Sequence, residues 1–192
     1  MDWLADKLTS YIVKEKNISS ESYEVYRYGM LTGLEMTLCM AICAIIAIHL
    51  KSFLEFTVLI AVFFSLRAYV GGIHLKHYLA CLVCSCLVIT VLLVASHSWN
   101  PDISVAAIVT FSSCIVINWL APSATKDRVN DQEEEAFFNK QRKRILFGIA
   151  ALDIVFIMLK LKVFWSLIMY TMLAVLFSMI LEISKKWMEA KR

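Results

Sequence analysis

Long apolar runs recur along most of this chain, and they constrain its fold more than any other feature. The longest of them reach about 20 residues, which is the length that a helix needs to cross a membrane. The runs cover residues 30–50, 53–66, 78–99, 103–121, 145–159 and 163–183. They predict an all-α, polytopic membrane protein with six transmembrane helices.

Composition favours a single membrane domain over residues 1–192. The chain is 60% hydrophobic and has a mean hydropathy of +0.70, whereas soluble domains are about 45–50% apolar. The net charge of +3 gives no reason to expect nucleic-acid binding. The second run, residues 53–66, is short for a span, so we expect it to thin the bilayer, to cross with little tilt, or to be re-entrant.

The first 28 residues form an amphipathic segment that is too charged to be a secretory signal peptide. Apolar side chains recur in it at helical spacing: Trp3, Leu4, Leu8, Tyr11 and Ile12. This pattern predicts a helix that lies on the lipid surface. The other long polar segment, residues 122–144, is predicted to be a loop between the fourth and fifth spans.

The basic residues are distributed unevenly between the two sides that six spans would define. Six spans place both chain termini on one side, together with residues 67–77 and 122–144. That side carries sixteen of the 19 lysines and arginines. Because cytoplasmic loops of membrane proteins carry an excess of Lys and Arg, we predict that both termini and these two connections are cytoplasmic.

The connection between the second and third runs combines a thiol, two imidazoles and a glycine pair: Gly71, Gly72, His74, His77 and Cys81. A cysteine becomes a nucleophile when a base or a positive charge makes its thiolate available. On a straight helix His77 would be adjacent to Cys81, whereas His74 would be roughly 10 Å away along the axis. His74 could reach the thiol only through a bend, which the glycines would permit. On spacing alone, interfacial histidines and a buried thiol fit equally well.

The remaining cysteines are predicted to be packing groups in apolar helices: Cys39, Cys43, Cys84, Cys86 and Cys114. A zinc site would have to combine His74, His77, Cys81 and Cys84. Two of those ligands lie inside a span, and the metal would compete with the nucleophile. We therefore expect no metal and no cofactor.

Two motifs resemble the signature of the accessory gene regulator B (AgrB) family. The first consists of Arg67, Gly72, His74, Cys81 and Ser85. The second, residues 121–126, has the sequence Ala-Pro-Ser-Ala-Thr-Lys and is similar to the Ala-Pro motif that opens the family's large cytoplasmic loop. Length, hydropathy and the charged amphipathic N-terminal segment also agree, so the resemblance covers essentially the whole chain.

This resemblance implies a membrane cysteine endopeptidase of bacteria that processes a quorum-sensing propeptide with an amphipathic leader and an acidic tail. By the resemblance, Cys81 is the nucleophile and His74 the base. Cys81 would attack the bond before the tail and hold the signal segment as a thioester. An internal Cys or Ser of the propeptide would then close a thiolactone or lactone ring. The family also implies a homodimer in the cell membrane, and the choice of His74 predicts a non-helical turn over residues 71–77.

Several nearby residues could support this chemistry. Arg67 would raise the thiolate population or hold a substrate carboxylate, unless it only anchors its helix at the interface. Gly71 and Gly72 could supply oxyanion-binding N–H groups or form only a tight turn. Glu35, about 8 Å into the first span, could orient the imidazole.

A basic cluster follows the Ala-Pro motif and consists of Lys126, Lys140, Arg142, Lys143 and Arg144. It could attract the acidic tail, or it could only set topology and meet anionic lipid. Residues 127–135 are mixed in sign, which departs from the mainly basic segment of the family.

Acidic residues within the spans support other functions. Glu35, Glu55 and Asp153 could line the path of a small transporter or exporter, and a chain without chemistry could be a membrane scaffold. A charge at the mid-span position of Asp153 costs about 2.5–3.5 kcal/mol on the insertion scale, so we expect Asp153 to face the bundle. Glu55 is expected near the face opposite Cys81.

Overall fold

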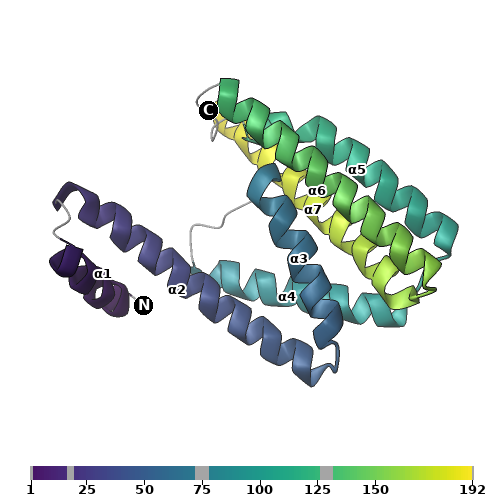
Figure 1. Ribbon diagram of the computed structural model, residues 1–192, viewed down its shortest axis with the longest axis horizontal. Helices are drawn as coiled ribbons and strands as arrows, with labels where there is room; N and C mark the ends of the chain where they lie inside the picture. Colours follow the sequence, from purple (N-terminus) through teal and green to yellow (C-terminus); the bar gives the residue numbers. More distant parts are fainter. Residues whose placement is uncertain (1, 17–19, 72–77, 126–131, 192) are drawn as a thin grey trace.

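The computed structural model describes the chain except for residues 1, 17–19, 72–77, 126–131 and 192. Every described element is an α-helix (Figure 1). The helices are α1 (Asp2–Lys16), α2 (Ser20–His49), α3 (Phe53–Val70), α4 (Tyr78–Ser98), α5 (Ile103–Thr125), α6 (Gln132–Met158) and α7 (Lys162–Ala190). The all-α fold predicted from the apolar runs is confirmed.

The second apolar run belongs to a longer helix than the sequence suggested. α3 continues through Arg67 to Val70 and has 18 residues, which gives a length of about 27 Å at 1.5 Å per residue. α3 is therefore long and apolar enough to cross a membrane, and the expected small tilt, thinned bilayer or re-entrant course stays a prediction. The charged side chain of Arg67 does not interrupt the backbone hydrogen bonds of α3. The helix therefore continues through Ala68, Tyr69 and Val70.

The connection expected as a loop over residues 122–144 is helical throughout its described part, so that expectation is wrong. α5 continues to Thr125, and α6 begins at Gln132. The first turn of α6 carries Glu133, Glu134 and Glu135, whose negative charges are favourable beside the positive end of the helix dipole. Charged residues with good helix propensity then carry the helix into its apolar half.

Five of the described helices are long and apolar enough to cross a membrane, namely α2, α3, α4, α5 and α7. Among the described residues, α6 does not meet this condition, because charges fill its first half and leave only a short apolar half. The chain is thus a polytopic membrane protein by length and composition. The sixth span remains a prediction for α6.

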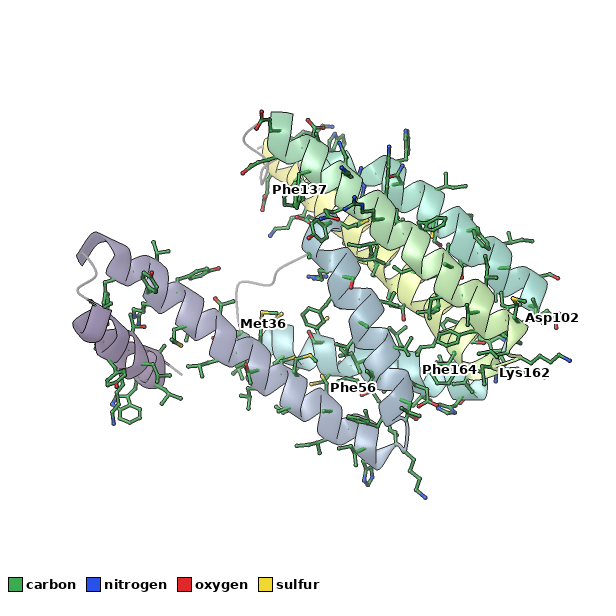
Figure 2. The ribbon with its side chains drawn as sticks, viewed as in Figure 1. Met36, Phe56, Asp102, Phe137, Lys162 and Phe164 are labelled. Carbon is green, nitrogen blue, oxygen red and sulfur yellow. The ribbon has the colours of Figure 1, made fainter. Side chains whose placement is uncertain are left out.

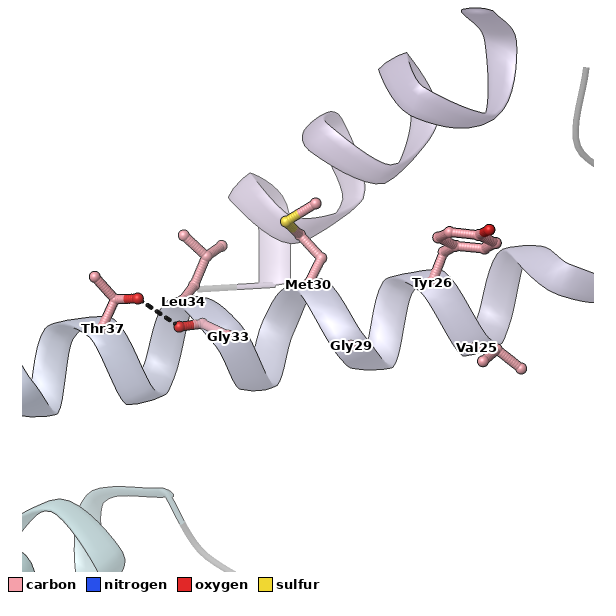
Figure 3. Close-up of a pocket in the computed structure, with 7 residues that line it drawn as sticks. All are labelled: Val25, Tyr26, Gly29, Met30, Gly33, Leu34 and Thr37. Carbon is pink, nitrogen blue, oxygen red and sulfur yellow. Dashed lines mark hydrogen bonds between the residues drawn. The ribbon is translucent and has the colours of Figure 1, made fainter. Parts of the chain in front are cut away.

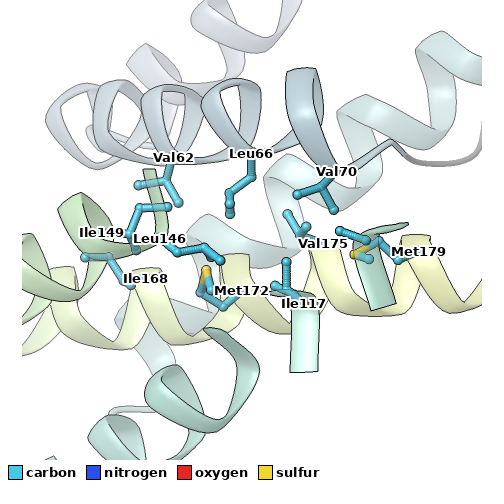
Figure 4. Close-up of a cluster of buried hydrophobic side chains, with 11 residues drawn as sticks. Val62, Leu66, Val70, Ile117, Leu146, Ile149, Ile168, Met172, Val175 and Met179 are labelled. Atoms are coloured by element: carbon cyan, nitrogen blue, oxygen red, sulfur yellow. The ribbon is translucent and has the colours of Figure 1, made fainter. Parts of the chain in front are cut away.

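α7 is the centre of the main bundle, with α3, α5 and α6 packed around it (Figure 1). One apolar cluster joins the four helices (Figure 4). Its buried members are Val62, Leu66, Val70, Ile117, Ala121, Leu146, Ile149, Ile168, Met172, Val175 and Met179. Side chains at helical spacing on each of the four helices meet here and form one core.

α2 and α4 form the second part of the molecule. They pack against each other and against α3, and α4 also contacts α7. Their shared cluster contains Cys43, Ala47, Phe56, Leu59, Ile89, Leu92, Leu93 and Leu167.

The N-terminal helix predicted from the spacing of its apolar residues is present as α1. Among the described helices it contacts only α2, and an ion pair between Asp6 and Arg27 joins the two. Ala5 is buried in this contact, whereas Trp3 and Tyr11 are exposed. α1 therefore presents aromatic side chains away from the rest of the chain.

Candidate functional site

The end of α3 provides one side of the candidate site. Gly71 terminates the helix with φ +84°, a backbone conformation that favours glycine, and its N–H donates to the Arg67 carbonyl oxygen at 3.3 Å. The chain thus leaves the helix at the first position of the predicted turn. Gly72, His74 and His77 lie outside the described residues, so the choice between the two histidines is not tested.

Cys81 lies in the first turn of α4, where its side chain is half-buried and its thiol is free. One turn before it, the Tyr78 hydroxyl donates to the Glu35 backbone carbonyl of α2 at 3.5 Å. The same hydroxyl lies within electrostatic range of the Glu35 carboxylate and of the Cys81 thiol. The fold therefore places Glu35 at the same end of the molecule as Cys81, as the helix depth predicted. Tyr78 was not singled out from the sequence, although its position three residues before Cys81 places it on the same face of α4.

Thiol side chains line the contact between α2 and α4. The Cys43 and Cys86 sulfur atoms are 3.7 Å apart, and Ser85 faces Cys39. Figure 2 shows sulfur-bearing side chains gathered between the two helices. Higher-numbered residues of α2 meet higher-numbered residues of α4, so the helices run in the same direction.

Most of the other cysteines have the packing role that was predicted. Cys43 is a buried member of the α2–α4 cluster, and Cys39 and Cys86 pack against it. Cys114 packs against the central cluster around α7. Cys84 is exposed, so the prediction of packing within the chain is wrong for this thiol.

Arg67 lies in the last turn of α3, one turn before Gly71. Its guanidinium carbon is 5.5 Å from the centre of the Phe63 ring, a cation–π contact on its own helix. This contact holds the guanidinium at the end of α3 that leads toward α4.

The basic cluster divides into one buried and three exposed side chains. Arg142 is only 3% exposed, and it donates to the Asn139 Oδ1 at 2.5 Å and to the Asn118 Oδ1 of α5 at 3.4 Å. Burial lowers the pKa of the Arg142 guanidinium, and the nearby Glu135 opposes that shift. The exposed members are Lys140, Lys143 and Arg144. Lys126 lies outside the described residues.

The far end of α3 and α4 carries a separate polar group. The Ser52 Oγ donates to the Leu50 carbonyl at 3.1 Å and lies 3.0 Å from the His97 Nε2. The Glu55 Oε1 is 3.7 Å from the same His97 nitrogen. Glu55 is in the first turn of α3, whereas Gly71 follows the last turn of α3 and leads toward the start of α4, where Cys81 lies. The Glu55 carboxylate is therefore at the end of α3 that is remote from Cys81.

α2 also carries an open apolar groove of about 520 Å³ (Figure 3). Its lining residues are Val25, Tyr26, Gly29, Met30, Gly33, Leu34 and Thr37. A Cβ atom added at Gly29 or Gly33 would meet nothing within 4 Å. The groove extends along α2 from Val25 to Thr37, and Glu35 lies within this stretch but does not line the groove.

The described part of the chain contains no group of three His, Cys, Asp or Glu side chains that could hold a metal ion. Glu35, Glu55 and Asp153 lie in three different places: the first beside Tyr78, the second beside His97, and the third buried in α6. The expected orientation of Asp153 toward the bundle is confirmed.

Comparison with known proteins identifies the family. The family model described as "AgrB: Accessory gene regulator B" matches residues 5–182. No curated protein and no solved structure matches the chain. The matched range contains all of α2 to α6 and most of α1 and α7, including both motifs that resembled this family. The protein therefore belongs to the accessory gene regulator B family, whose members are membrane proteins with a role in quorum-sensing propeptide processing.

Proposed function

We propose that this protein is a cysteine endopeptidase that removes the acidic C-terminal tail of a quorum-sensing propeptide and releases the signal segment as a ring. The observation that carries the proposal is the family match together with the position of Cys81, a free and half-buried thiol in the first turn of α4.

The proposed reaction has two acyl transfers. In the first, the Cys81 Sγ attacks the carbonyl carbon before the tail, His74 accepts the thiol proton, and the same imidazole returns it to the amine of the departing tail. In the second, a thiol or hydroxyl within the bound segment attacks the Cys81 thioester. This forms the thiolactone or lactone and regenerates the Cys81 thiol.

The surroundings of Cys81 support cyclisation over hydrolysis. Cys39, which packs against the apolar cluster between α2 and α4, is within electrostatic range of Cys81, and exclusion of water protects a thioester from hydrolysis. The Gly71 N–H already donates to the Arg67 carbonyl. In the proposal, therefore, Gly72 rather than Gly71 contributes an oxyanion-binding N–H, and Glu35 orients the imidazole.

The exposed cations are proposed to recognise the tail. Lys140, Lys143 and Arg144 project from α6 beside its apolar half, where an acidic peptide at the membrane surface would meet them. Arg142 has a different proposed role, because its buried guanidinium is bonded to two asparagine side chains. We propose that Arg142 holds α5 and α6 together near the connection between them. We propose that this connection is cytoplasmic. We also propose that the protein works as a homodimer.

Intact-mass spectrometry of the lipid-embedded protein with its cognate propeptide tests the mechanism. We expect the wild type to release the tail and to carry a transient peptide adduct, and both products to be lost in Cys81→Ala. Cys84→Ala is the matched control, because this exposed thiol lies one turn further along α4 and should be dispensable. Tail release by Cys81→Ala would exclude the mechanism.

The two histidines are compared in the same assay. His74→Ala should abolish adduct formation, while His77→Ala should retain it. The reverse result would assign the base to His77 and leave the endopeptidase function in place.

A further inference from the structure

The bundle around α7 contains a completely buried carboxyl group. Asp153 lies in the apolar half of α6 and is 0% exposed. Neither of its carboxyl oxygens has a hydrogen-bond partner in the described part of the chain. Buried polar groups are almost always bonded, and ionisable residues at membrane depth generally have a function, so this group requires an explanation.

Thr110 is the nearest polar neighbour on α5. Its hydroxyl interacts with the Asp153 carboxyl group, but the pair does not have full hydrogen-bond geometry, and the hydroxyl is buried without a hydrogen-bond partner among the described residues. Cys114, one turn further along α5, is within electrostatic range of Asp153. In the described part of the chain, the side chains that interact electrostatically with this carboxyl group are thus Thr110 and Cys114, and neither carries a positive charge.

Apolar layers lie on both sides of this pair. Ile149, one turn before Asp153 on α6, belongs to the central cluster. Ile157, one turn after it, packs against the separate cluster formed by Ala106, Trp165 and Met169. The carboxyl group therefore lies in a polar layer between two clusters of apolar side chains.

The polar side chains of α7 in this region mostly bond elsewhere. Ser166 donates to the Asn100 Oδ1 at 3.2 Å, and Thr171 donates to the Leu167 carbonyl of its own helix at 2.7 Å. The remaining donor is the Trp165 indole N–H, which is neutral and has no partner among the described residues. α7 therefore offers the carboxyl group no compensating positive charge.

We propose that Asp153 is a proton-binding site inside the membrane bundle. An ionised carboxylate without a cation would be an uncompensated charge in an apolar layer, whereas a carboxylic acid is neutral there. Its O–H group donates to the Thr110 hydroxyl after a small side-chain rotation. Two carboxyl oxygens and one hydroxyl are too few for Mg²⁺ or Ca²⁺, which take about six or more oxygen ligands. The site is separate from Cys81 and does not depend on the peptidase function.

Infrared spectroscopy of the full chain in lipid tests this site directly. At neutral pH the wild type should show the C=O stretch of a carboxylic acid, moved to lower frequency in D₂O. The difference spectrum of wild type and Asp153→Asn should assign that band to Asp153. Absence of the acid band from the wild type would overturn the proposal whether or not the variant folds. Loss of a carboxylate band in Asp153→Asn would also overturn it.

Two further variants make the assignment specific. Asp102→Asn removes an exposed carboxyl group in the turn between α4 and α5, and it should leave the acid band unchanged. Thr110→Val preserves the shape of its side chain but removes the hydroxyl, so the acid band should move to higher frequency. An unchanged frequency in Thr110→Val would exclude Thr110 as the partner of the acid.

Discussion

The two parts of the molecule differ in how much of each helix is buried. In the most apolar stretch of α7, 50% of the residues are buried, compared with 11% in α2. α7 is surrounded by α3, α4, α5 and α6, whereas α2 contacts only α1, α3 and α4 among the described helices and carries the open groove. The proposed chemistry is thus in the loosely packed part, where local rearrangement costs least, and most of the core is in the other part.

Replacement of the proposed nucleophile should have the largest effect. We expect Cys81→Ala to reduce tail release by more than about 1,000-fold, because loss of a covalent catalyst removes the pathway itself. Its melting temperature in detergent should remain that of the wild type, because the thiol is only half-buried and makes no disulfide. A large fall in melting temperature would show that Cys81 belongs to the structural part of the molecule.

A core substitution in α7 should have the opposite outcome. Met172 is 0% exposed, and Met172→Ala should lower the free energy of unfolding by about 2–5 kcal/mol through the cavity that it leaves. Met36→Ala in α2 is the matched control. Met36 is 48% exposed, so the change should stay within about 0.5 kcal/mol. Equal shifts in thermal unfolding would remove the distinction between the two parts.

Two members of the basic cluster should have different roles: Arg142 should stabilise the fold, and Lys143 should contribute to propeptide binding. Arg142→Ala leaves the amide oxygens of Asn118 and Asn139 without this donor, so it should destabilise the protein by about 1–3 kcal/mol. Lys143→Ala should leave stability unchanged and raise the KM for the propeptide a few-fold. Thermal unfolding and steady-state cleavage distinguish the two. An unchanged melting temperature in Arg142→Ala would contradict the structural role.

The last prediction concerns the contact between α2 and α4. Tyr78→Phe removes the hydroxyl that donates to the Glu35 carbonyl and should slow tail release by up to about tenfold, the equivalent of one hydrogen bond. Tyr170→Phe is the control, because that hydroxyl donates to the Trp99 carbonyl at 2.8 Å, away from Cys81. A similar loss in both variants would indicate a general loss of stability.

The helices themselves could be predicted from the sequence because most of the apolar runs have the length that membrane helices require. Their ends could not. Arg67 ends the apolar run but not α3, and the charged residues 132–144 were assigned to a loop although glutamate, lysine and arginine are good helix formers. Hydropathy measures where a segment partitions, not where its backbone hydrogen bonds stop.

The environment of individual side chains was predictable only in part. The buried position of Asp153 followed from the cost of a charge at mid-span depth. Arg142, by contrast, looked equivalent to Lys143, because only the packed helices bring Asn118 of α5 beside it. Tyr78 was missed for the same reason, since its partner lies 43 residues away in the chain.

The polar group at the far end of α3 and α4 has a mechanical consequence. Ser52, at the start of α3, contacts His97 at the end of α4, and it follows the last turn of α2. Apolar packing of Ala47 and Leu93 adjoins this point. The C-terminal ends of α2 and α4 are thus held together by these contacts. A change in the angle between the two helices about these contacts would therefore separate Cys81, in the first turn of α4, from Glu35, near the middle of α2.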